Sequence, residues 1–102
     1  KMPKVRPHSE IGCLVTGVCR LADGRPRAAL AVRFTPGRGG VWNGRVIGKT
    51  PVTVQTDSHG RFRITLAPSA AVGRYSVQMD DANYTIDVPD AAEARFADIV
   101  VS

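Results

Sequence analysis

Residues 52–67 read VTVQTDSHGRFRITLA, and they carry the clearest structural pattern in the chain. Apolar and polar residues alternate with a period of two before residue 57 and again from residue 61, which is the pattern of a half-buried β-strand. The intervening Asp57-Ser58-His59-Gly60 is typical of a tight turn, because aspartate bonds to nearby backbone and glycine accepts a positive φ. This stretch therefore predicts a hairpin whose second strand buries Phe62, Ile64 and Leu66.

Short apolar segments separated by turn signals continue in both directions from this hairpin. The other strands are expected at residues 11–21, 28–35, 45–48 (weakly), 75–79, 84–88 and 96–101. A glycine-rich loop is expected at 36–44; no stretch supports a long helix, although residues 90–95 could form one helical turn. Seven or so strands, spaced roughly 8–12 residues apart, predict an all-β fold: a seven-stranded antiparallel β-sandwich with Greek-key connections.

The length and the apolar content bound the domain organisation. At 102 residues the chain has the size of one domain, which we place at residues 11–102. Residues 1–10 hold two prolines and no periodicity, so they are interpreted as a basic arm or linker, which we expect to insert into a neighbour. No apolar run approaches the roughly 20 residues of a membrane span, so membrane insertion is not expected. The basic start lacks the apolar stretch of a signal peptide, so either the chain is used without export or a signal was removed.

Two cysteines, Cys13 and Cys19, lie in the first expected strand. Six residues of extended chain span about 20 Å, whereas a disulfide requires Cα atoms within about 7 Å. The two thiols therefore cannot pair with each other in that strand. We expect two small buried side chains made in a reducing compartment, with an intermolecular disulfide as the alternative.

Charge is separated along the sequence, although the net charge is only +5. Residues 1–79 hold 13 Lys or Arg and 3 Asp or Glu, whereas residues 80–102 hold one arginine and six acidic residues. Ordinary solvated surface charge is one explanation. The other is a polar subunit whose basic face meets an acidic face of its neighbour in a homo-oligomer, or of a partner protein.

Two stretches resemble a known family. GVCRLADGRP (residues 17–26), followed by Ala29 and Val32-Arg33-Phe34, is similar to the opening hairpin of carboxypeptidase regulatory-like domains. TDSHGRFRI (56–64) resembles the family's TD-x-x-G-x-F hairpin, and LAP (66–68) with GRYSV (73–77) resembles its LPPG-x-Y-x-V continuation. The resemblance implies a prealbumin-like (transthyretin-like) β-sandwich. It implies no chemistry, because the matched residues are turn glycines, a turn aspartate and core apolar side chains.

The segment VPDAAEA (88–94) before the last expected strand resembles small β-domains of bacteriophage tail and baseplate proteins. This resemblance implies a structural or attachment module of a virion, made in the bacterial host cytoplasm and acting through contacts with other proteins of the same assembly. The alternative is a carbohydrate-binding or cell-surface-binding accessory domain of a secreted protein.

Enzymes of the same fold family give little support for catalysis. Hydroxyisourate hydrolases have a histidine in the first strand, where this chain has Cys19, and a terminal Tyr-Arg-Gly-Ser, which this chain lacks. Intradiol dioxygenases hold iron with two tyrosines and two histidines. This chain has Tyr75, Tyr84, His8 and His59, but on inward strand positions, in the arm and in a turn, so they are not expected to converge.

No catalytic residue, cofactor or metal site is therefore predicted, although a vestigial or genuine hydrolase stays a third hypothesis. DDAN (residues 80–83) is interpreted as a hairpin turn rather than a calcium site, because a turn needs the same residue types.

The remaining hypothesis for the function is binding of a partner by the outer surface of the domain. The loop at 37–48 carries the single tryptophan, Trp42, flanked by Arg38 and Arg45, and the strand after the turn exposes Arg61 and Arg63. An aromatic ring beside arginines suits a protein contact or a sugar, although the indole could instead fold back over one end of the sandwich. Nucleic acid is not expected as a partner, because the arginines are scattered along strands without aromatic residues at stacking spacing.

Overall fold

A computed structural model describes residues 12–80 and 82–101. In this part of the chain the elements are β1 (Cys13–Val18), β2 (Ala31–Thr35), β3 (Gly40–Trp42), β4 (Arg45–Ile47), β5 (Val52–Gln55), β6 (Arg61–Leu66), α1 (Ser69–Val72), β7 (Tyr75–Met79), β8 (Ala82–Ile86), β9 (Glu93–Arg95) and α2 (Phe96–Ile99). The structure is mostly β, which confirms the predicted all-β class. The predicted basic arm, residues 1–10, lies outside the described residues.

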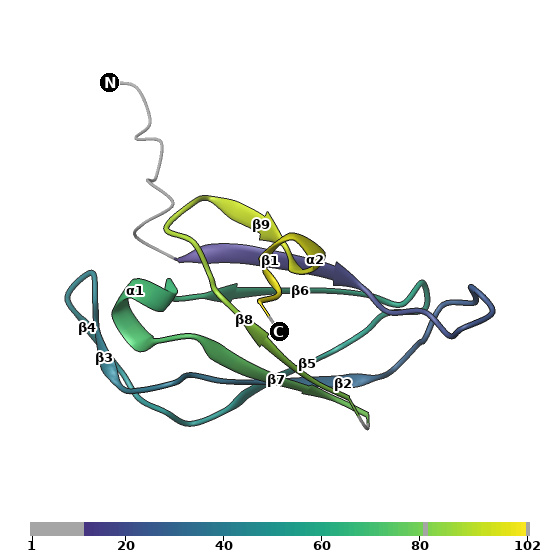
Figure 1. Ribbon diagram of the computed structural model, residues 1–102, viewed down its shortest axis with the longest axis horizontal. Helices are drawn as coiled ribbons and strands as arrows, with labels where there is room; N and C mark the ends of the chain where they lie inside the picture. The colour runs from purple at the N-terminus through teal and green to yellow at the C-terminus, as the bar shows by residue number, and fades with distance from the viewer. Residues whose placement is uncertain (1–11, 81, 102) are drawn as a thin grey trace, which may run out of the picture.

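The strands form a three-stranded sheet in the order β6-β1-β9, a four-stranded sheet in the order β5-β2-β7-β8, and the β3–β4 hairpin. Figure 1 shows α1 and the β3–β4 hairpin at one end, and the loops that follow β1 and precede β6 at the other. The first expected strand is central in its sheet, as its apolar character predicted, although it ends at Val18 rather than Leu21.

Most neighbouring strands are antiparallel, but β9 runs parallel to β1, with Leu14 opposite Glu93 and Thr16 opposite Arg95. The expectation of an antiparallel arrangement throughout was therefore wrong at this strand. The physical reason lies in the connection: β9 follows β8, which belongs to the other sheet, so no hairpin turn imposes an antiparallel direction on the β1–β9 pair.

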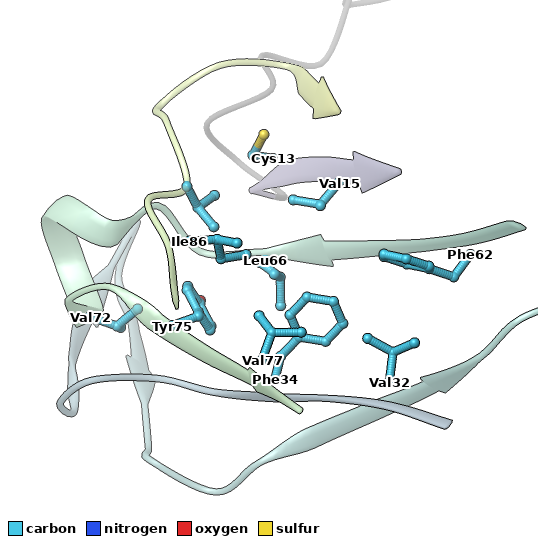
Figure 2. Packing of buried hydrophobic residues seen from close by; sticks show 11 residues of the cluster. Cys13, Val15, Val32, Phe34, Phe62, Leu66, Val72, Tyr75, Val77 and Ile86 are labelled. Carbon is cyan, nitrogen blue, oxygen red and sulfur yellow. The ribbon is translucent and has the colours of Figure 1, made fainter. Parts of the chain in front are cut away.

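Both larger sheets contribute side chains to one buried core (Figure 2). Its buried members are Cys13, Val15, Val32, Phe34, Phe62, Leu66, Val72, Tyr75, Val77, Ile86 and Val88. The alternation along β6 is confirmed: Phe62 and Leu66 are buried and Ile64 is partly buried, whereas the residues between them are exposed. Burying each large apolar side chain stabilises the fold by roughly 1.5–3 kcal/mol.

The turn before β6 forms as predicted, but the predicted hairpin was wrong: β5 pairs with β2 in the four-stranded sheet, whereas β6 pairs with β1 in the three-stranded sheet. The turn therefore carries the chain from one sheet to the other. Asp57 Oδ1 accepts hydrogen bonds from the N–H groups of His59 (2.8 Å) and Arg61 (3.0 Å), and Gly60 has a φ of 77°. The buried Thr56 hydroxyl accepts from the Leu30 N–H (2.8 Å) and donates to the Arg27 carbonyl (2.7 Å). These bonds tie the turn to the chain that leads into β2.

Three further local predictions were wrong. Residues 90–95 contain β9 rather than a helical turn, the loop at 36–44 contains β3, and the strand expected at 96–101 begins with α2. Only the end of that last segment pairs with β8, through an antiparallel bridge between Val100 and Ile86. The reason is that α2 carries the chain from the edge of one sheet to the edge of the other, where the Val101 N–H donates to the Thr85 carbonyl (2.8 Å).

Candidate functional site

An open groove of about 1120 Å³ lies at the end of the molecule where β1 and β6 meet the turns. We call it the arginine-rimmed groove. Its floor includes the apolar side chains of Leu30, Val54, Phe62, Met79 and Phe96. Its rim holds Arg20, Arg27, Arg61, Arg63 and Arg95.

One side of the groove lies where β9 ends before β1. β9 pairs only with residues 14–16, so Gly17 and Val18 have no strand on that side among the described residues. Gly17 faces the Phe62 ring, and a Cβ at this position would collide with that ring. The missing side chain therefore lets Phe62 lie close to β1.

A chain of aromatic rings joins the two sheets at the groove. The centroid of Phe62 lies 5.9 Å from that of Phe34 and 5.8 Å from that of Phe96. Phe96 in turn meets the ring of Tyr84 edge-on, at 5.9 Å. Tyr84 lies on the same face of β8 as buried Ile86, as predicted, but it is 37% exposed because the groove opens beside it.

The rim arginines differ in their partners. Arg27 pairs with Asp80 (2.9 Å) and Arg95 with Asp98 (3.0 Å), while Arg20 donates to the Gly24 carbonyl (3.0 Å). Exposed Arg61 and Arg63 form no ion pair with any described residue. Arg20 likewise has no ion pair within the described ranges, so these three guanidinium groups have no described carboxylate that a ligand would have to displace.

Two aspartates also line the groove, and both are engaged. Asp80 holds Arg27, and the N–H groups of Arg61 and His59 hold the pKa of the Asp57 carboxyl below its usual range. Five arginines against two aspartates leave the groove with a net positive charge.

The five residues expected to form an interaction surface do not come together. Arg61 and Arg63 line the groove, whereas Arg38, Trp42 and Arg45 lie in or beside the β3–β4 hairpin at the opposite end (Figure 1). Sequence reasoning missed the rest of the groove. Arg20 and Arg27 flank a turn that was predicted, so they could have been found from it.

On the β3–β4 hairpin, the aliphatic side chains are more exposed to solvent than the indole of Trp42. Trp42 is half-buried, and its Nε1 is enclosed without a hydrogen-bond acceptor among the described residues. Arg38 donates to the Ala70 carbonyl (3.1 Å). The cross-strand pair Val41 and Val46 is 65% and 86% exposed.

The residues considered for catalysis lie apart. Buried Tyr75 donates its hydroxyl to the Ala67 carbonyl (2.8 Å), His59 is exposed in the turn, and His8 lies outside the described residues. No group of three or more His, Cys, Asp and Glu side chains within residues 12–80 and 82–101 is placed to hold a metal ion.

Both cysteines are free. Cys13 is buried and Cys19 is partly buried, with its thiol 3.9 Å from the Met79 sulfur. Burial raises the pKa of both thiols, which favours the protonated form and is the opposite of what activates a cysteine nucleophile.

Comparisons with known proteins give no relative for this chain: no family model matches it, and no curated protein matches it. In the described ranges, no helix is long and apolar enough to cross a membrane.

Proposed function

We propose that this chain is a non-enzymatic binding module of a larger assembly, built as a prealbumin-like β-sandwich with Greek-key connections. Two sheets that share one core support the sandwich assignment. The hairpin landmarks support the family resemblance, because Gly24 and Gly60 both adopt the positive φ that the turns need.

The arginine-rimmed groove is the observation that carries the proposal. Protein-binding surfaces combine an apolar centre with a polar rim, and they are enriched in arginine and aromatic residues. The groove has this composition, with Phe62, Phe96 and Met79 at its floor and Arg61 and Arg63 at its rim. It therefore supports a protein contact better than a catalytic role.

The biological setting that we propose is a bacteriophage tail or baseplate protein, located in the virion. It rests on the resemblance of residues 88–94 to small β-domains of such proteins, and the two free cysteines are consistent with synthesis in a reducing compartment. A homo-oligomer stays a prediction of the charge separation along the sequence. The carbohydrate-binding alternative would act through Trp42, whose half-buried indole offers less open ring surface than such a site needs.

The proposal is tested by selecting binders from a random-peptide library on three forms of the chain. Val18→Glu places a charge on a 54% exposed residue of the groove, and Val46→Glu is the matched control at an exposed valine of the distant hairpin. We expect wild type and Val46→Glu to enrich the same peptides, and Val18→Glu to lose them. Circular dichroism checks that both variants are folded.

Two results would overturn the proposal. One is that no peptide is enriched on wild type. The other is that peptides survive Val18→Glu but are lost with Val46→Glu, which would place binding on the hairpin.

A further inference from the structure

The first observation about what the groove binds concerns the edge of β1 that no described strand covers beyond the end of β9. The Cys19 N–H donates to the Gly60 carbonyl (2.7 Å), and the Cys19 carbonyl accepts from the Arg27 N–H (2.9 Å). Backbone groups of successive strand residues point to alternate sides. Those of Val18 therefore point to the other side, where β9 has already ended.

α2 follows β9 directly and also lies beside β1, so in the described part of the chain the stretch of edge without a neighbouring strand is the short one at Val18. A short open edge of this kind is a template for another extended chain. Such a chain would lie beside Val18 and above the floor of the groove. There the T-shaped contact of Phe96 with Tyr84 and the thioether of Met79 form an apolar surface that is open to solvent. One large apolar side chain of a bound peptide would cover that surface.

The second observation is charge. Val18 is opposite Arg61 in the β1–β6 register, and Thr16 is opposite Arg63 on one side and Arg95 on the other. Arg61 and Arg63 belong to β6, across β1 from its open edge, and as direct cross-strand partners they lie on the same face of the sheet as Val18 and Thr16. Neither has an acidic partner among the described residues. Carboxylates are the complementary ligands, and arginine binds them with two parallel hydrogen bonds.

We propose that the arginine-rimmed groove binds an extended acidic segment of a partner protein that carries one large apolar side chain. This inference rests on the proposed function and names its partner chemistry. Nucleic acid fits less well, because Phe62 is only 4% exposed and Phe96 meets it edge-on, which leaves Tyr84, at 37%, as the one exposed ring among the described residues of the groove. A single ring offers a nucleic acid strand little to stack on.

Fluorescence anisotropy with labelled probes tests the inference. The probe is a short peptide with glutamates on both sides of a single phenylalanine. Three comparison probes replace the glutamates with lysines, replace the phenylalanine with serine, or use a single-stranded DNA oligonucleotide. We expect the acidic phenylalanine peptide to bind at least about tenfold more tightly than each of them, and to weaken as salt rises.

The matched variants separate the groove from general surface charge. Charge reversal at the rim (Arg61→Glu with Arg63→Glu) should weaken binding at least about tenfold. Arg33→Glu, an exposed arginine of the four-stranded sheet, should change it by less than about twofold.

Equal binding of the lysine peptide, tighter binding of DNA, or an unchanged affinity after rim reversal would each refute the acidic-peptide inference. The library selection distinguishes this failure from that of the proposed function. Enriched peptides that lack acidic residues but depend on Val18 would leave the binding module intact and remove only its acidic partner.

Discussion

The hydroxyl of Tyr75 is a polar group inside an apolar core. The residue is buried, and its single hydrogen bond donates to the Ala67 carbonyl at 2.8 Å. Burial raises the pKa of Tyr75 from 10 to about 12. Because the folded pKa lies above the unfolded one, the neutral phenol stabilises the fold fully below pH 10, and this stabilisation is lost as pH rises from 10 to 12.

Tyr75→Phe should therefore cost about 1 kcal/mol of unfolding free energy near neutral pH, because the hydrogen bond is lost and the Ala67 carbonyl is left without it. Relative to the variant, the wild type should lose about 1.4 kcal/mol for each pH unit between 10 and 12, so its advantage should vanish and then reverse within this range. Urea denaturation of both proteins across this pH range measures the difference. A difference that stays constant up to pH 12 would contradict the assigned pKa.

At the scale of elements, the period-two strands were predictable because their signal is local. β6 shows its inward and outward positions in neighbouring residues, and the turn before it is specified by Asp57 and Gly60. That β5 and β6 belong to different sheets could not be read from these residues, because each strand's partner is distant in sequence. The structure of residues 93–101 was not predictable in this way. β9 is only three residues long, and its direction is set by pairing with β1, which is distant in sequence.

The residues of the candidate site also differ in whether a local sequence pattern predicts them. Arg61 and Arg63 were recognised as exposed because β6 alternates, and both line the groove. Phe96 and Arg95 reach it only because the chain crosses from one sheet to the other after β9. No local pattern marks that crossing, so the groove as a cavity could not be inferred from the sequence.

The position of the Phe62 ring against β1 depends on one glycine. Gly17→Ala should destabilise the fold by about 1–3 kcal/mol, because the new Cβ forces the Phe62 ring out of its place between Phe34 and Phe96. Gly48→Ala is the matched control, since nothing lies within 4 Å of a Cβ there, and it should change stability by less than about 0.5 kcal/mol. Neither glycine has a positive φ, so backbone strain does not confound the comparison.

Chemical denaturation of the two glycine variants provides the free energies, and the aromatic proton resonances of Phe62 report the movement of its ring. Equal stability of both variants would mean that Phe62 has room to move and that the aromatic chain does not hold the two sheets together.

At the scale of the whole molecule, arginines of the same chain partly neutralise the acidic C-terminal part of the sequence. Three acidic residues of the C-terminal part pair with arginines of the same chain: Asp80 with Arg27 (2.9 Å), Asp87 with Arg74 (3.9 Å) and Asp98 with Arg95 (3.0 Å). All three pairs are partly or largely exposed, so each contributes little to stability. They nevertheless occupy carboxylates that an electrostatic contact between subunits would need.

We therefore expect the predicted homo-oligomer to be held by contacts that depend little on salt. The Debye length falls from about 30 Å at 0.01 M to about 3 Å at 1 M ionic strength, so a contact between a basic and an acidic face would weaken strongly over this range. Size-exclusion chromatography with light scattering should give the same molar mass at both ends of it. A mass that falls as salt rises would show that acidic side chains outside these three pairs join the subunits, and it would restore the charge-driven homo-oligomer predicted from the sequence.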